Sequence, residues 1–265
     1  MNTETIRLWP GTDIPSTLTR HVRPDSIVRP VVFVIPGGGY HFVCETTEGS
    51  PIADRFDELG FQTFVLDYRV APNNPWPATL DDAMRAMRLI RGHGAEWGAN
   101  PDAIAVCGFS AGGHLAASLG TIAPELSTAH AGDAFDDVRA TPDAMILCYP
   151  VILSGPRGHA GSRVNFFGTE TPSAEQDELF SLDRHVADDT PPAFLWTTVE
   201  DDVVPMENSV EFFRAMRRHG RVAELHIFPH GHHGMQLGYG RRDIAQWPAL
   251  ADAFLRDSCG FPPAG

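Results

Sequence analysis

Short apolar runs alternate with amphipathic segments along most of this 265-residue chain, and this alternation restricts the folds open to it. Most runs are apolar at consecutive positions, as strands are when helices cover both faces of a sheet. The intervening segments place apolar residues three or four positions apart, which indicates helices. We therefore expect an α/β fold with a mostly parallel central sheet and helices on both faces. The runs occupy residues 31–35, 61–66, 103–107, 144–149, 193–198 and 223–228.

Capping residues mark the expected helix boundaries. Ser50 is suited to an N-cap and is followed by Pro51, which is favoured in a first helical turn; Gly60 would end that helix. Thr79 and Asp82 have the spacing of a capping box, which predicts that a second helix begins near them.

One stretch, residues 155–192, interrupts the alternation. It is rich in Gly, Ser, Pro and charged residues and has only a weak helical pattern. Long irregular segments inside compact domains are usually functional. We interpret residues 155–192 as a lid or pocket loop within a single domain spanning residues 1–265; a passive surface excursion is the alternative.

A sharp turn is predicted where the run 103–107 ends. The sequence Gly108-Phe109-Ser110-Ala111-Gly112 matches the G-x-S-x-G pattern and is followed by small and apolar residues typical of a buried helix. The pattern by itself is common, but the turn from strand to helix is so tight that the second residue on either side of the serine must be small. We expect Ser110 to be a nucleophile exposed at the carboxyl edge of the sheet, where open α/β sheets bind ligands.

A glycine run, residues 37–39, follows the first apolar run. Acyl transfer places negative charge on a carbonyl oxygen, which backbone N–H groups can stabilise in an oxyanion hole. We expect the N–H groups of Gly38, Gly39 and Ala111 to form this hole, with Gly37 shaping the turn. Glycines in this position could also bind phosphate, but the chain lacks both G-x-G-x-x-G and the Lys-Ser/Thr of a P-loop.

Carboxylates follow the run 193–198 and are candidates for the residue that orients a catalytic histidine. Glu200 is the nearest to the strand, and Asp202 would point away from Asp201 if the backbone is extended there. A carboxylate after this strand would complete the order serine, acid, histidine that the fold requires, and we favour Asp201 because Glu200 is expected to be too early in the turn.

Three histidines follow the last run, at positions 230, 232 and 233. His233 directly precedes a glycine, which would allow the chain to turn back over the sheet edge, so we favour His233 as the general base over His232 and His230. A metal bound by this cluster is the alternative, but no further ligand set is evident. His114, beside the nucleophile turn, is expected to be a packing residue or pocket wall.

Composition indicates which binding partners and which cellular compartment to expect for the protein. A formal net charge of -14 disfavours nucleic acid and anionic membranes and suits a neutral small-molecule ester substrate. The chain has no membrane-length apolar segment, and its first residues do not resemble a secretory signal, so we expect a cytoplasmic protein. Cys107 and Cys148 lie in apolar runs, so we expect buried, reduced thiols. Neither a metal nor an organic cofactor is implied, and the oligomeric state is left open.

These residues resemble a subgroup of α/β-hydrolases that contains acetyl esterases and acetyl-xylan-type carbohydrate esterases. The resemblance covers nearly the whole chain from about residue 31, and it implies the α/β-hydrolase fold with a small lid-like insertion after the sixth core strand. In that family the acid stands before two residues and Val-Pro, which selects Asp201, and the base precedes a glycine, which selects His233. The resembling stretches are residues 36–40, 66–69, 104–114, 190–196, 201–208 and 226–234.

The resemblance also implies a function. It indicates a serine carboxylester hydrolase that removes acetyl or other short acyl groups from a small neutral substrate such as an acetylated xylo-oligosaccharide. Alternatives are an amide or formamide hydrolase on the same scaffold and a non-catalytic binding protein that retains the fold. Tyr40 is a candidate substrate-binding residue, Trp76 a candidate pocket aromatic, and Trp196 is more consistent with core packing.

Overall fold

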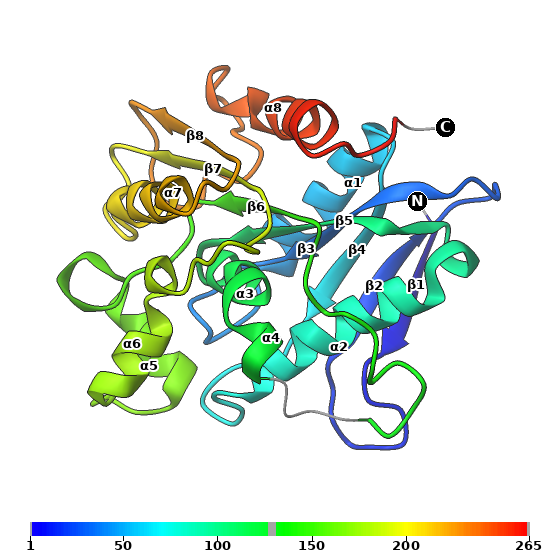
Figure 1. Ribbon diagram of the computed structural model, residues 1–265, viewed down its shortest axis with the longest axis horizontal. Helices are drawn as coiled ribbons and strands as arrows, with labels where there is room; N and C mark the ends of the chain where they lie inside the picture. Colours follow the sequence, from blue (N-terminus) through cyan, green and yellow to red (C-terminus); the bar gives the residue numbers. More distant parts are fainter. Residues whose placement is uncertain (1, 127–130, 264–265) are drawn as a thin grey trace.

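An eight-stranded sheet runs through the protein in the computed structural model, which describes residues 2–126 and 131–263 (Figure 1). The strand order is β1-β2-β4-β3-β5-β6-β7-β8. Strands β3 to β8 are parallel, whereas β2 pairs antiparallel with both β1 and β4. The strands are β1 Asn2–Arg7, β2 Thr17–Val22, β3 Arg29–Ile35, β4 Gln62–Asp67, β5 Ala99–Phe109, β6 Ala144–Cys148, β7 Ala193–Thr198 and β8 Ala223–Phe228. The mostly parallel sheet expected from the sequence is confirmed.

The six apolar runs correspond to β3 through β8, and the two strands missed by the sequence analysis are the antiparallel pair at the edge. Strand β1 is almost entirely exposed, and β2 has only two buried residues, Leu18 and His21, among half-buried ones. Neither carries the continuous apolar run of a strand that is buried on both faces. Strand β2 pairs with the free edge of β4 and β1 pairs with β2, so both depend on a neighbouring strand rather than on a local sequence pattern.

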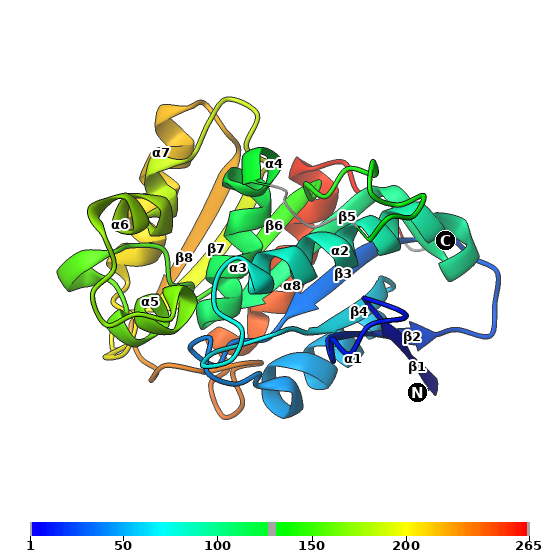
Figure 2. The ribbon, with the colours of Figure 1, turned by 90° about the horizontal axis from the view of Figure 1, so that it is seen from below.

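Helices cover both faces of the sheet (Figures 1 and 2). Helices α1 and α8 bury apolar residues in one core layer, and α2, α3 and α7 contribute to the layer on the opposite face. The helices are α1 Ser50–Glu58, α2 Ala78–His93, α3 Ser110–Thr121, α4 Ala123–Leu126, α5 Ala160–Phe167, α6 Ala174–Phe180, α7 Glu207–Arg218 and α8 Trp247–Ala253.

The predicted caps are only partly right. Helix α1 begins at Ser50 with Gly49 as its N-cap, one residue before the expected cap. The prediction of a capping box at Thr79 is wrong, because α2 already begins at Ala78 and no side chain caps it. Asp82 is instead fully buried, and it forms an ion pair with Arg69 at 2.8 Å. The burial of this carboxylate within a helix is a tertiary effect that the local spacing could not indicate.

The segment 155–192 contains helices α5 and α6 and two single 3₁₀ turns rather than an irregular loop. A capping box formed by Ser173 and Gln176 starts α6. Both ribbon views place α5 and α6 side by side near α3, at the end of the molecule away from β1 and β2 (Figures 1 and 2). The segment lies between β6 and β7, that is, after the fourth of the six expected apolar runs.

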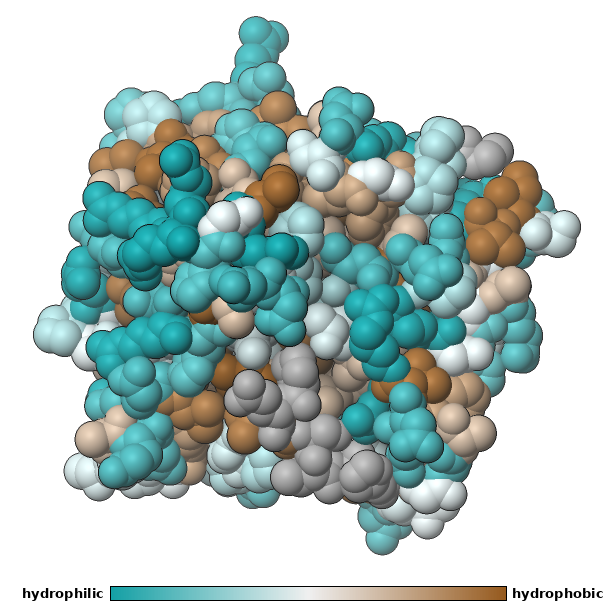
Figure 3. All heavy atoms as spheres, in the orientation of Figure 1, coloured by the Kyte–Doolittle hydropathy of each residue, from teal (hydrophilic) through white to brown (hydrophobic). Residues whose placement is uncertain are grey.

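The surface seen in Figure 3 is mostly hydrophilic, with apolar residues in small separate groups. Among the described residues, none of the helices combines the length and the apolar character needed to cross a bilayer. The side chains of Cys107 and Cys148 are buried in adjacent strands β5 and β6, and all four cysteines are unpaired.

Candidate active site

Ser110 lies on the sharp turn between β5 and α3. Its φ of 51° is in the left-handed region, which non-glycine residues adopt rarely and mainly at functional sites. The turn leaves no room for side chains at the flanking glycines. A Cβ on Gly108 would lie 2.3 Å from the carbonyl oxygen of Gly112, and a Cβ on Gly112 would lie 2.2 Å from that of Ile35. The sequence analysis expects small residues at these two positions, and the close approach of neighbouring backbone atoms explains why.

The structure brings together the serine, acid and histidine that the sequence analysis favours. The ring of His233 lies between the other two side chains, with Nε2 at 2.9 Å from Ser110 Oγ and Nδ1 at 2.7 Å from Asp201 Oδ2. Backbone N–H groups of Val203 and Val204 donate to Asp201 Oδ1 at 3.0 and 2.8 Å. The carboxylate is thus held in place on one side while its other oxygen accepts from the imidazole.

The competing candidates point elsewhere. Glu200 accepts hydrogen bonds from His230 at 2.7 Å and from the backbone N–H of Gly231, and Asp202 is exposed. The Nδ1 atom of His232 lies 2.5 Å from the carbonyl oxygen of the next residue. No group of three or more His, Cys, Asp or Glu side chains within the described ranges could hold a metal ion.

The glycine run follows β3 and faces the same hollow as Ser110. Gly38 and Gly39 line this hollow, and within the described part of the chain their N–H groups donate to no acceptor. Ala111 is the second residue of α3, where a backbone N–H has no intrahelical acceptor. The Gly37 N–H, in contrast, donates to Glu48 Oε2 at 2.8 Å, so Gly37 shapes the turn as expected.

Tyr40 does not line the hollow, which corrects its prediction as a substrate-binding residue. Its side chain is completely buried, and its hydroxyl donates to Nδ1 of His114 at 2.8 Å. The Nε2–H of His114 donates in turn to the carbonyl oxygen of Phe180 at 3.0 Å. Burial lowers the pKa of His114 to about 3, which keeps the ring neutral and suited to this bridge. Both residues pack the core beneath the glycine run.

Trp76 and Trp196 also pack against other aromatic side chains and do not line the hollow. Trp196 is completely buried, as expected, and its ring stacks on Trp247 at 5.6 Å. The ring of Trp76 packs against Phe166 of α5, with centroids 5.0 Å apart. The aromatic side chain that does face the hollow is Phe42, which is 55% exposed.

Glu48 is a site residue that the sequence analysis missed. It lines the hollow yet is only 4% exposed, and besides Gly37 it accepts a hydrogen bond from the hydroxyl of Tyr149 at 2.8 Å. That hydroxyl accepts from the backbone N–H of Gln236, three residues after His233. Burial raises the pKa of the Glu48 carboxyl, against the opposing effect of its hydrogen bonds and of His233. This network ties the glycine run to the histidine loop.

The sequence carries no signal for this role, because Glu48 stands in a polar stretch three residues after another glutamate. Its burial comes from a single π-helical turn, Glu45–Gly49, which directs the side chain under the glycine run.

The hollow in front of Ser110 has a volume of about 610 Å³. Besides the glycine run and the histidine loop, the α5 segment contributes His159 and Asn165 to its wall. Asn165 donates from Nδ2 to the carbonyl oxygen of Gly39 at 2.9 Å, so α5 is attached directly to the glycine run.

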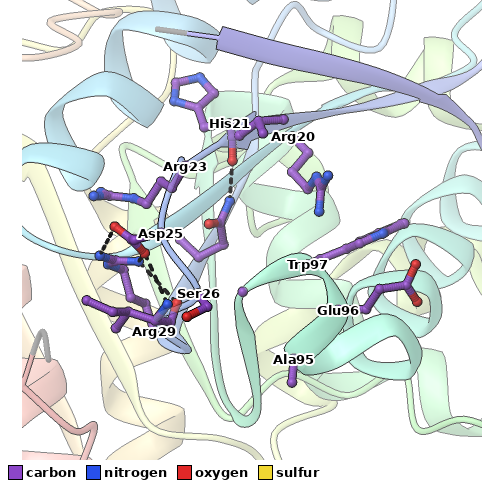
Figure 4. A pocket seen from close by; sticks show the side chains of 13 residues that line it. Arg20, His21, Arg23, Asp25, Ser26, Arg29, Ala95, Glu96 and Trp97 are labelled. Carbon is purple, nitrogen blue, oxygen red and sulfur yellow. Dashed lines mark hydrogen bonds and ion pairs between the residues drawn. The ribbon is translucent and has the colours of Figure 1, made fainter.

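A second hollow of about 270 Å³ lies beside β2 and the turn after α2 (Figure 4). Three arginines line it, but each is paired with a carboxylate. Arg20 binds Glu4 at 2.6 Å, Arg23 binds Asp57 at 2.6 Å, and Arg29 forms the pair with Asp25 drawn in Figure 4. The charges of all three arginines are thus already paired with carboxylates.

Known proteins resemble the chain over most of its length. The model of the BD-FAE family matches residues 23–216. The chain is 36% identical to the endo-1,4-beta-xylanase B of Butyrivibrio fibrisolvens over 225 residues, which are 83% of this chain and 34% of that protein. It is 31% identical to an acetylxylan esterase of Xylanibacter ruminicola over 245 residues, covering 85% of this chain and 47% of that protein. The chain thus spans between about a third and a half of the length of these relatives.

Solved structures match over almost the full chain. An acetyl ester-xyloside bifunctional hydrolase from Caldicellulosiruptor lactoaceticus superimposes with a TM-score of 0.89 at 36% identity, covering 97% of each chain. The butyrate-bound esterase Est2 of Thermogutta terrifontis superimposes with a TM-score of 0.81 at 26% identity, covering 99% of this chain and 96% of that one. These similarities confirm the expected fold and the resemblance on which it was based.

Proposed function

The chain belongs to the BD-FAE family of α/β-hydrolases, and from this premise we propose that it is a serine carboxylester hydrolase that removes acetyl or other short acyl groups from a small neutral substrate such as an acetylated xylo-oligosaccharide. The observation that carries the proposal is the hydrogen-bonded line from Ser110 through His233 to Asp201, at 2.9 and 2.7 Å. A nucleophile, a base and an orienting acid in this order form the arrangement that activates a serine hydroxyl.

In the proposed reaction, His233 accepts the proton of Ser110 as the hydroxyl attacks the ester carbonyl. Asp201 accepts a hydrogen bond from Nδ1–H and stabilises the imidazolium that forms. The N–H groups of Gly38, Gly39 and Ala111 stabilise the negative charge on the carbonyl oxygen. The alcohol leaves with the proton returned by His233, and water, activated by the same base, hydrolyses the acyl-serine.

The acyl and alcohol classes are supported by the relatives and by charge. One relative is named an acetylxylan esterase, and one structural neighbour is described as an acetyl ester-xyloside hydrolase. Two of the Est2 structures contain butyrate and propionate, which correspond to short acyl groups. A formal charge of -14 suits an uncharged sugar ester better than an anionic one.

The test is the substitution Ser110→Ala, assayed with 4-nitrophenyl acetate and with acetylated xylo-oligosaccharides. We expect near-complete loss of hydrolysis with an unchanged thermal unfolding midpoint, together with loss of labelling by a fluorophosphonate that marks the wild-type serine. Substantial remaining turnover in Ser110→Ala would refute the assignment.

Two further measurements separate the alternatives. Faster cleavage of aryl amides than of acetyl esters would favour an amide hydrolase on the same scaffold. A series of 4-nitrophenyl esters tests the acyl length, and a preference for long acyl chains would exclude the acetyl-esterase proposal while leaving the role of Ser110 intact.

A further inference from the structure

His159 is a polar side chain in the wall of the hollow that the proposed reaction does not use. It stands at the N-cap of α5, and its Nδ1 accepts a hydrogen bond from the backbone N–H of Ser162 at 3.1 Å. The Ser162 hydroxyl lies 2.8 Å from the same nitrogen. Ser162 itself is completely buried and lies beside Gly39, which places the His159 ring next to the glycine run.

The cap determines which ring nitrogen carries the proton. A backbone N–H can only donate, so Nδ1 of His159 must be the unprotonated acceptor, and the neutral ring then carries its hydrogen on Nε2. Burial and the nearby His233 lower the pKa of His159, so the neutral form prevails near pH 7. Within residues 2–126 and 131–263, Nε2 makes no hydrogen bond. His159 thus presents a free N–H donor in the wall of the hollow.

Asn165 supplies the complementary acceptor. The carbonyl oxygen of Gly39 must face the amide NH₂ group, because a carbonyl only accepts, and this orients the amide. The Asn165 Oδ1 atom is then left as an acceptor without a partner among the described residues. Both side chains come from the α5 segment and line the same hollow as Ser110.

The chemistry of an acetyl ester indicates which part of the substrate these groups would meet. Beyond its carbonyl oxygen, for which the glycine run already provides donors, an acetyl group offers only a methyl group. Polar groups elsewhere in the hollow therefore have hydrogen-bonding partners only on the alcohol part.

We propose that His159 and Asn165 form a subsite for the alcohol part of the ester, in which the Nε2–H of His159 donates to one hydroxyl of a sugar unit and Asn165 Oδ1 accepts from another. This inference rests on the proposed function. The exposed ring of Phe42 provides an apolar surface in the same hollow, against which the C–H face of a sugar ring can pack.

The substitution His159→Asn separates binding from helix capping. Asparagine is a good N-cap and places Oδ1 near the position of the histidine Nδ1, so the cap for Ser162 is retained while the Nε2 donor is removed. His219→Asn is the matched control, because His219 is a half-exposed residue after α7 whose ring binds Asp188 and is absent from the wall of the hollow.

The readout is the ratio of kcat/KM for an acetylated xylo-oligosaccharide to kcat/KM for 4-nitrophenyl acetate, whose alcohol part has no hydroxyl groups for the subsite. We expect His159→Asn to lower this ratio about tenfold or more, as the loss of one hydrogen bond to a bound polar group does. His219→Asn should keep the wild-type ratio. An unchanged ratio in His159→Asn, including an equal loss on both substrates, would overturn the proposal.

A binding measurement tests the subsite independently of turnover. In a Ser110→Ala background, we expect His159→Asn and Asn165→Ala each to weaken the binding of unacetylated xylo-oligosaccharide, measured by calorimetric titration, about tenfold. Unchanged affinity in both variants, or no measurable binding in Ser110→Ala alone, would refute the subsite. If wild-type protein cleaves neither ester, the proposed function fails, and this titration still decides whether the subsite exists.

Discussion

The substitution Asp201→Asn should inactivate the proposed enzyme by reversing the tautomer of its base. Asp201 Oδ1 accepts two backbone N–H groups, from Val203 and Val204. In an asparagine the carbonyl oxygen must keep this place, because an NH₂ group there would face two donors. The NH₂ group is then directed at Nδ1 of His233, which must accept. The ring proton moves to Nε2, where it faces Ser110 and cannot take the serine proton.

The expected magnitude is large. An equivalent asparagine in serine proteases lowers kcat by about 10⁴ while leaving the geometry intact, which corresponds to about 5 kcal/mol of transition-state free energy. The assay is the initial rate with 4-nitrophenyl acetate near pH 7.5, with thermal unfolding as the check on folding. Asp202→Asn is the matched control, because this neighbouring carboxylate is exposed, and it should retain at least half of the wild-type kcat. If Asp201→Asn kept more than a tenth of the wild-type kcat, or if Asp202→Asn were the inactive variant, the reasoning would be wrong.

Three further predictions concern stability. Gly112→Ala places a Cβ 2.2 Å from the carbonyl oxygen of Ile35, so we expect the free energy of unfolding to fall by about 3 kcal/mol or more. The measurement is the denaturant midpoint, and a midpoint equal to wild type would contradict the tight turn. Arg69→Met leaves the fully buried Asp82 without its ion pair, and we expect the free energy of unfolding to fall by about 3–5 kcal/mol. A change below about 1 kcal/mol would show that the other hydrogen-bond donors to Asp82 suffice. His114 has a folded pKa of about 3, below the value of about 6.5 in the unfolded chain, so the unfolded state takes up a proton first as the pH falls. Stability should therefore decrease between about pH 6.5 and pH 3, by about 3 kcal/mol at pH 4, and His114→Gln should remove this part of the pH dependence; an identical pH dependence in both proteins would refute it.

The parallel part of the sheet was predictable because burial on both faces produces continuous apolar runs. The edge strand β1 was not, because its residues are exposed and polar and their pairing depends on a neighbour distant in sequence. Residues 155–192 lie between β6 and β7, and their helices were not predicted in full. Helix α5 has only eight residues, and its start depends on the side chain of His159 acting as a cap.

Burial of particular polar and aromatic side chains was the main source of error at the site. Tyr40 directly follows the glycine run, which made it a reasonable substrate contact, yet its side chain turns into the core to meet His114. Glu48 was overlooked because nothing in its neighbours distinguishes it from an exposed glutamate. In both cases the direction of the side chain is set by the backbone of an irregular segment, and that backbone is held by contacts with distant elements.

By itself, the sequence determined the alternation of strands and helices, the glycine-flanked turn at Ser110 and the order of serine, acid and histidine. Each of these depends on the size, polarity and spacing of residues that are close together in the chain. Only the tertiary structure decided that Asp201 rather than Asp202 or Glu200 meets the imidazole, and that His233 rather than its neighbours reaches Ser110. Adjacent residues in a loop point in different directions, and which one faces the site depends on where the carboxyl ends of β5, β7 and β8 stand relative to one another in the folded sheet.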